Sequence, residues 1–324
     1  MKDKTSNRIL YHYCSTNTAY EILKSKTLRM SDITKSNDYD EIYSFFPGIL
    51  DAIADKYKED EFELLYRNRK NRDALSLLLE MEYNYIDDLF KGGGLTSFVV
   101  CFCEEGNLLS QWRGYADDAK GCSIGFSEKE INELCIKENN LFTLAKVKYK
   151  TSKQLSVIIA NSAKKILKGL RDIRNVIERD LEVFVRNGKT DDIIALIFHK
   201  WVCKFIINSL QYKNYAYKEE REWRLFFNCN VKEQVDLVFS DEKIDTLFND
   251  DLIKKLRNRI DFKVTNNNII PFFPVELFEL SKNPIKEIYL GPENRIREKD
   301  FELLCAKFGY KNIRLKCSSI SYRS

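Results

Sequence analysis

The stretch LTSFVVCF, residues 95–102, decides the fold of this chain. Apolar residues run without interruption from Phe98 to Phe102, and the run mixes aromatic and β-branched side chains without helical spacing. Such a run is typical of a strand that is buried on both faces. Three glycines, Gly92-Gly93-Gly94, come directly before it and would end any preceding helix. The stretch therefore predicts the central strand of a sheet.

Further strand patterns lie on both sides of this central strand. They are found at residues 8–13, 28–31, 121–126, 222–228, 260–264, 269–280, 285–290 and 313–317. Helical spacing of apolar residues is seen at Thr16–Ser25, behind cap candidates such as Ser15, and at Glu298–Phe308. A β-α-β-like end of the chain is predicted by the strand patterns at residues 285–290 and 313–317 and the helical pattern between them.

Two longer segments have apolar residues every three or four positions, at about residues 40–90 and 150–215. No internal repeat or Pro-rich linker divides the chain. We therefore expect one α+β domain over residues 1–324, with these two segments as helical insertions. Its central sheet is expected to be mixed and largely antiparallel.

The composition excludes several classes of protein. The chain has 324 residues, 44% hydrophobic and 31% charged, and a formal charge of +4, which is far from the charge of an obvious nucleic-acid binder. Its 9 cysteines are an odd number, spread through a chain far longer than a disulfide-stapled secreted domain, so free thiols in a reducing cytosol are expected. No segment reaches the roughly 18 continuous apolar residues of a membrane span. A cytoplasmic location without membrane contact is expected.

Five segments, which extend over nearly the whole chain, resemble one bacterial family. They are residues 9–41, 99–127 (containing SQWRGYADDAKG), 215–226 (YAYKEEREWRLF), 266–278 and 285–295. Together they resemble the family catalogued as domain of unknown function 2971, whose name implies no reaction. The chain departs from the family at Ala119, where many relatives have a histidine; if that histidine is catalytic in relatives, activity is in doubt here.

The first residues also resemble the start of NAD-dependent ADP-ribosyltransferases. The resemblance lies in Leu-Tyr-His, the following helix and the strand of residues 28–31. It implies an ADP-ribosyltransferase-like fold and makes His12 a catalytic candidate that holds the nicotinamide ribose through a ring nitrogen. The residue-level alternative is a half-buried strand histidine bonded to the backbone. Tyr11 and Ser31 are implied as cofactor contacts.

The same resemblance points to Glu222 in Glu220-Arg221-Glu222, directly before an apolar strand. Its carboxylate would bond the ribose and stabilise the positive charge that develops as nicotinamide leaves. Strand alternation puts Arg224 on the same face, where it could meet Glu222 or a pyrophosphate. The alternative is a solvated charge run beside a strand.

The remaining candidate contacts are polar or aromatic groups between these two ends. Arg113 could hold phosphate and Tyr115 could stack a base, whereas Trp112 is expected in the core. Asn37 lies in a polar turn, where its side chain could either contact a ligand or cap the following helix. The leading hypothesis predicts that His12, Ser31, Tyr115 and Glu222 line one cleft.

The sequence thus predicts an enzyme that uses NAD to modify an unidentified protein or nucleic acid, or that hydrolyses NAD. A role in bacterial antiphage defence or as a toxin is expected from what such families often do. Two alternatives stay open: a metal-dependent nuclease built on carboxylates such as Asp38, Glu41 and Glu222, and a non-catalytic binding or sensor module. No metal site is predicted, because Cys101-x-Cys103 has no complementary pair at zinc spacing.

Overall fold

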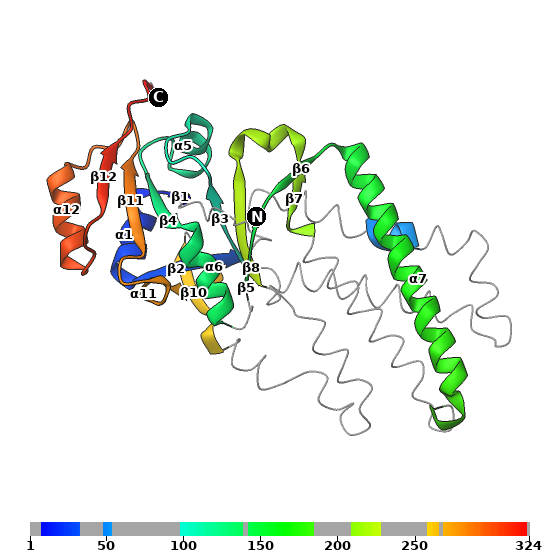
Figure 1. Cartoon of the computed structure of the whole chain (residues 1–324). Helices are drawn as coiled ribbons and strands as arrows, with labels where there is room; N and C mark the ends of the chain where they lie inside the picture. The colour runs from blue at the N-terminus through cyan, green and yellow to red at the C-terminus, as the bar shows by residue number, and fades with distance from the viewer. Residues whose placement is uncertain are drawn as a thin grey trace, which may run out of the picture.

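The structure is a computed structural model, and it describes residues 8–32, 48–53, 98–138, 142–184, 209–227, 258–265 and 268–322. Asn37, Asp38 and Glu41 lie outside these ranges, as do residues 40–47, 54–90 and 185–208 of the expected insertions. Figure 1 shows a sheet with helices packed around it, and a long helix, α7 (Ser152–Phe184), that extends away from it.

The described part of the chain contains one large sheet. Its strands are β1 (Ile9–Cys14), β2 (Thr27–Asp32), β3 (Phe98–Cys103), β4 (Cys122–Ser127), β5 (Phe142–Lys146), β8 (Glu222–Phe227), β9 (Asp261–Thr265), β10 (Asn268–Glu276), β11 (Ile285–Leu290) and β12 (Arg314–Cys317). The order is β12-β11-β4-β1-β3-β2-β10-β9, and β8, with β5 beside it, also pairs with β3. The pairs are antiparallel except β11–β12. The expected α+β class with a largely antiparallel sheet is confirmed.

The sheet divides at β3. Strand β8 pairs along one edge of β3, from Val99 to Cys103. On the other edge, β1 pairs only at Cys103 and β2 only at the opposite end, at Val99 and Phe98. Both β1 and β2 run antiparallel to β3 and pair with the same edge of it. They therefore separate at the middle of that edge. We call this point, centred on Cys101, the fork.

Helices cover the sheet. They are α1 (Thr16–Ser25), α5 (Leu109–Tyr115), α6 (Glu128–Lys137), α11 (Leu277–Leu280) and α12 (Glu298–Lys307), with a 3-10 helix, η4 (Tyr215–Glu220). A small parallel pair, β6 (Lys148–Lys150) and β7 (Tyr212–Asn214), lies beside η4. Helix α1 begins where the Ser15 hydroxyl accepts a hydrogen bond from the Thr18 amide, as expected of a cap.

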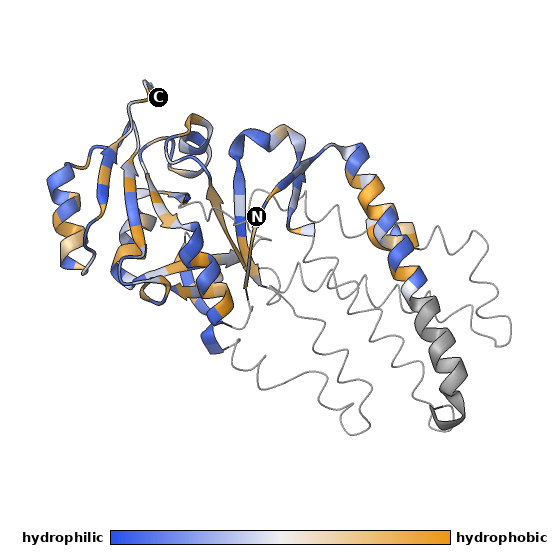
Figure 2. Ribbon diagram, viewed as in Figure 1, coloured by the Kyte–Doolittle hydropathy of each residue, from blue (hydrophilic) through white to orange (hydrophobic). Residues whose placement is uncertain are grey.

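The core lies on both faces of the sheet. One cluster joins alternate residues of β1, β3 and β4 to the apolar side of α1, where Ala19, Ile22 and Leu23 are buried. A second cluster on the other face contains Tyr11, Tyr13 and Trp112. Figure 2 shows the corresponding concentration of hydrophobic residues on β3 and its neighbours. The two clusters make β3 an internal strand, as its sequence predicts.

Most expected elements are found close to their predicted bounds, but α6, β5 and β6 were not predicted, and two expected segments differ from their predictions. The strand predicted over residues 269–280 ends at Glu276, because Leu277 starts α11 and donates its amide to the Lys26 carbonyl. The second expected insertion contains β7 and the start of η4 in addition to α7. Residues 48–53 of the first insertion are helical. Within the described residues, no helix is long and apolar enough to cross a membrane.

Candidate functional site

Cys101 is the one exposed position that interrupts an otherwise buried β3. The burial pattern of this strand leaves every residue from Phe98 to Cys103 buried except Cys101, although β3 is internal in the sheet. A central strand normally hides its side chains on both faces. The side chain of Cys101 is therefore accessible to solvent at the fork.

His12 reaches Cys101 from β1. Its Nδ1 lies 3.0 Å from the Cys101 carbonyl oxygen, at a point of β3 where neither β1 nor β2 pairs. A carbonyl oxygen only accepts, so Nδ1 carries the proton and Nε2 keeps its lone pair. Burial, with a smaller effect from the charge of Lys263, lowers the pKa of the half-buried His12 below its usual value. The ring is therefore neutral at pH 7, with Nε2 as an acceptor. The expected alternative, a backbone bond, is present at Nδ1.

Glu222 reaches the same cysteine from β8, within a cluster of buried charges. Arg224 donates from Nε to Oε1 at 2.7 Å and from Nη2 to Oε2 at 3.0 Å, and Lys213 Nζ lies 3.3 Å from Oε2. Only 5% of Glu222 and 1% of Arg224 are exposed. The Cys101 thiol is also hydrogen-bonded to Glu222. The run of charges at residues 218–224 is thus partly a buried network.

This charged environment keeps Glu222 ionised. Burial alone would raise the pKa of the carboxyl, but the charges of Arg224 and Lys213 outweigh it and lower the pKa to about 2. Arg224 also donates to the Leu210 carbonyl, and the Glu222 amide donates to the Tyr149 hydroxyl at 2.7 Å. The carboxylate is therefore held in one orientation by β6, β7 and β8 together.

The low pKa of Glu222 predicts a loss of stability in acid. The folded pKa lies below the ordinary 4.5, so the contribution of Glu222 is complete above pH 4.5 and is lost as the pH falls towards 2. We expect Glu222→Gln to be less stable than wild type at pH 7 and this difference to shrink at pH 3. Urea unfolding at both pH values measures it; a difference that stays constant with pH would contradict the assignment.

Tyr115 belongs to the edge of this charge cluster. Its hydroxyl donates to Glu220 Oε1 at 3.1 Å, and the other oxygen of Glu220 accepts from Lys213 at 2.5 Å. Tyr115 is 39% exposed, whereas Trp112 on the same helix is fully buried, as the sequence predicts, and donates to Asn107. Arg113 is exposed and lies beside Tyr322. The structure therefore links Tyr115, but not Arg113, to the Glu222 cluster.

Tyr11 is directed away from the fork. It lies in a row across the sheet with Gly125, Glu287, Cys103 and Glu222. Because Gly125 has no side chain, the Tyr11 ring lies over it and the hydroxyl donates to Glu287, two strands away. That carboxylate is 2% exposed and also binds Arg314 and Lys316 at 3.0 Å. This network gives the Tyr11 hydroxyl a structural partner on the side of β1 away from Cys101.

Sheet register decides which predicted residues share a face. Ser31 pairs with Val99, which pairs with Phe226, so the side chain of Ser31 lies on the face that carries Glu222 and Arg224. His12 leaves β1 on the opposite face, and only its ring reaches the Cys101 carbonyl at the fork. The structure thus brings His12 and Glu222 together through Cys101 and not through a direct contact.

Sequence reasoning did not find Cys101, Lys213 or Lys263 as parts of this region. Lys213 is 2% exposed and compensates Glu222, but it lies in an unremarkable Tyr-Lys-Asn segment. Alternation along β3 correctly puts Cys101 and Cys103 on one face, and no pattern distinguishes the exposed one. Only the separation of β1 and β2 beside Cys101 does so.

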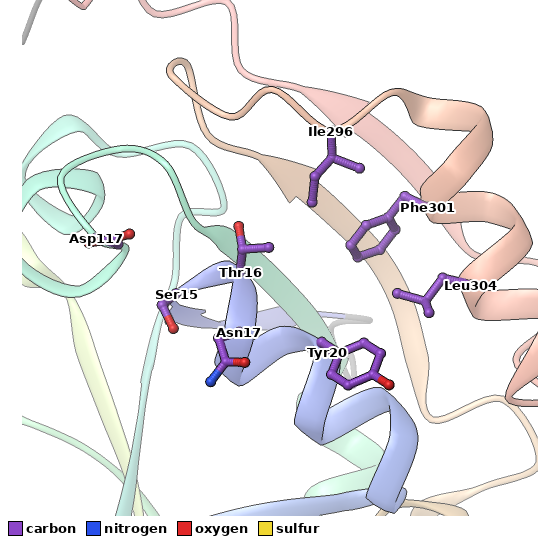
Figure 3. A pocket seen from close by; sticks show the side chains of 8 residues that line it. All are labelled: Ser15, Thr16, Asn17, Tyr20, Asp117, Ile296, Phe301 and Leu304. Atoms are coloured by element: carbon purple, nitrogen blue, oxygen red, sulfur yellow. The ribbon is translucent and has the colours of Figure 1, made fainter. Parts of the chain in front are cut away.

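A separate cavity of about 630 Å³ lies between α1 and α12. Figure 3 shows Ile296, Phe301 and Leu304 on one side, facing Thr16 and Tyr20 of α1. Its other lining residues are Ser15, Asn17 and Asp117. None of the predicted site residues lines it. Asp117 begins a turn in which Asp118 and Ala119 also have positive φ, and Ala119 is buried against the cluster of Tyr13 and Trp112.

No group of three His, Cys, Asp or Glu side chains that could hold a metal ion occurs within the described ranges. The carboxylates of the nuclease alternative that can be placed reduce to Glu222, which is ion-paired to Arg224 and Lys213. In the described part of the chain, the polar side chains at the fork are therefore the bases His12, Lys213 and Arg224 and the ionised carboxylate of Glu222.

Fold and site together define an α+β protein with a divided, largely antiparallel sheet and polar groups at the division. A family model described as Protein of unknown function (DUF2971) matches residues 111–225, from α5 to β8. The match covers less than half of the 324 residues and supports the family that the five segments resemble. Searches of curated proteins and of solved structures found no match.

Proposed function

We propose that this protein is an ADP-ribosyltransferase-like enzyme that binds NAD at the fork. It would transfer ADP-ribose to a protein or nucleic acid, or to water. The observation that carries the proposal is that Cys101, exposed in a buried strand, bonds His12 through its carbonyl and Glu222 through its thiol. A ribose placed over Cys101 would meet both candidate groups.

His12 would orient the ribose. With Nδ1–H held by the Cys101 carbonyl, Nε2 can accept a hydrogen bond from a ribose hydroxyl, and no hydrogen bond from the described residues occupies it. The lowered pKa favours the neutral ring that such an acceptor requires. A ring fixed at one nitrogen loses little freedom when the other binds a ligand, which favours a reactive geometry.

Glu222 would stabilise the charge that forms as the bond to nicotinamide breaks. Its carboxylate is ionised over the whole physiological pH range, with a pKa of about 2. Arg224 and Lys213 offset much of its charge and occupy both oxygens. A ribose hydroxyl would therefore replace the Cys101 thiol as a donor, and Glu222 would act mainly through that hydrogen bond.

Two substitutions of His12 separate catalysis from folding. His12→Asn can keep an N–H near the position of Nδ1 but removes Nε2, whereas His12→Gln can place an amide near Nε2 but loses the bond to Cys101. We expect His12→Asn to unfold within about 1 kcal/mol of wild type and to lower nicotinamide release from NAD by about 100-fold or more. His12→Gln is expected to be the less stable of the two.

The measurement is release of free nicotinamide from NAD by the purified chain, together with NAD binding by calorimetry. Binding is included because a transferase without its acceptor can bind NAD and turn it over slowly. If wild type neither binds NAD nor releases nicotinamide, the proposal is wrong. It is equally wrong if His12→Asn keeps wild-type turnover, since His12 would then serve only the Cys101 carbonyl.

A further inference from the structure

Two basic residues share the face of the sheet that carries Ser31. Arg29 and Ser31 of β2 pair with Pro274 and Phe272 of β10, and the β10 register continues to Asp261 and Lys263 of β9. Opposite residues of antiparallel strands project to the same side. The side chains of Arg29, Ser31 and Lys263 therefore lie on one face, with Ser31 between the two bases.

Arg29 has incomplete hydrogen bonding. Its Nη2 lies 3.6 Å from Glu21 Oε2, a distance of an ion pair without a close hydrogen bond, and its guanidinium packs 4.9 Å from the centre of the Phe272 ring. Only 22% of the side chain is exposed. The Nε atom is buried and has no hydrogen-bond partner. A buried N–H of a charged group without an acceptor is costly, so an acceptor supplied by a ligand would stabilise it.

Lys263 is half-buried and has no carboxylate within ion-pair distance among the described residues. Burial, and then the positive charge of Arg29, lower the pKa of Lys263. The charge of Lys263 in turn contributes to the lowered pKa of His12. Lys263 thus lies within electrostatic reach of both Arg29 and His12, and the two cations, Arg29 and Lys263, repel each other. Among the described residues, the carboxylates near this region are Asp261, which lies in the same row as Ser31, and Glu21, 3.6 Å from Arg29; neither lies within ion-pair distance of Lys263.

We propose that Arg29 and Lys263, with the Ser31 hydroxyl between them, bind the phosphate groups of a nucleoside diphosphate. Arginine can bind phosphate oxygens through two N–H groups, lysine acts as a point charge, and a serine hydroxyl donates one further bond. Ser31 pairs with Val99 of β3, two residues before Cys101, which places the phosphates next to the fork. The inference rests on the proposed function and deepens it, because NAD contains an ADP group.

Binding of ADP and of adenosine to the full chain, measured by calorimetry at two salt concentrations, tests the site. We expect wild type to bind ADP more tightly than adenosine, and Lys263→Gln and Arg29→Gln each to weaken ADP binding by about tenfold. Lys282→Gln, at an exposed lysine after α11, is the matched control and should bind ADP as wild type does. Adenosine binding should be the same in all four proteins.

Stability provides a second readout that distinguishes a ligand site from a structural one. Removing one of two repelling bases should leave the melting temperature of Lys263→Gln equal to or above that of wild type. Equal ADP affinity in wild type and Lys263→Gln, or no ADP binding by wild type, overturns the site. ADP binding that depends on Lys263 in a protein that releases no nicotinamide retains the phosphate site and rejects the NAD chemistry.

Discussion

Replacing Arg224 with Met should lower the free energy of unfolding by about 3–5 kcal/mol. Arg224 is 1% exposed and makes both close contacts with Glu222 through Nε and Nη2. Met fills a similar volume but leaves Glu222 buried with Lys213 as its only strong charge partner among the described residues. An incompletely compensated buried carboxylate is strongly destabilising, which is the physical reason for the size of the effect.

A matched substitution is available three residues earlier in the chain. Arg221 also binds a carboxylate, Glu105, at 2.6 Å, but both side chains are about half exposed. Because exposed ion pairs contribute little, Arg221→Met should change the free energy of unfolding by less than about 1 kcal/mol. Urea unfolding followed by circular dichroism compares the two. Similar effects of both substitutions would mean that burial of the Glu222 cluster does not determine its energetic role.

Gly121→Ala should destabilise the protein by about 3–5 kcal/mol or prevent folding. A Cβ at Gly121 would lie 2.1 Å from the Cys14 carbonyl oxygen and 2.8 Å from the Ala116 carbonyl oxygen. Both obstacles are backbone atoms, which cannot rotate aside as a flexible side chain would. The Gly121 amide also donates to the Ala116 carbonyl at 2.8 Å, so the turn before β4 would have to open.

Gly114 is the control for this substitution. It lies exposed in α5, and a Cβ there would meet no atom within 4 Å. Alanine loses less backbone entropy than glycine in a helix, so Gly114→Ala should raise the free energy of unfolding by about 0.5–1 kcal/mol. Thermal and urea unfolding should therefore give opposite signs for the two substitutions. Equal effects would show that a Cβ at Gly121 does not clash with the carbonyl oxygens of Cys14 and Ala116.

Element types were largely predictable because local patterns determine them. The apolar run at residues 98–102 forms the internal strand β3, and Ser15 caps α1 as expected. The strand predicted through Leu280 ends at Glu276 because the α11 contact with Lys26 comes from a distant part of the chain. Apolar patterns show which residues are buried, but they do not show which backbone donor meets which acceptor.

The candidate site was predictable only in part. Alternation along the strand correctly puts Glu222 and Arg224 on one face, where they form an ion pair. The partner of Tyr11 was not predictable, since it depends on Gly125 lying between two strands that are far apart in sequence. Lys213 and Lys263 were missed for the same reason: their importance comes from what surrounds them and not from a motif.

The sequence by itself determined the class of fold and the internal position of β3. Periodicity and strand alternation are local properties, so they can be read along the chain. The tertiary structure alone decided that β1 and β2 part at Cys101, and that His12 and Glu222 meet at this residue from different strands. Strand pairing joins residues about a hundred positions apart, and no local pattern specifies which edge two strands will share.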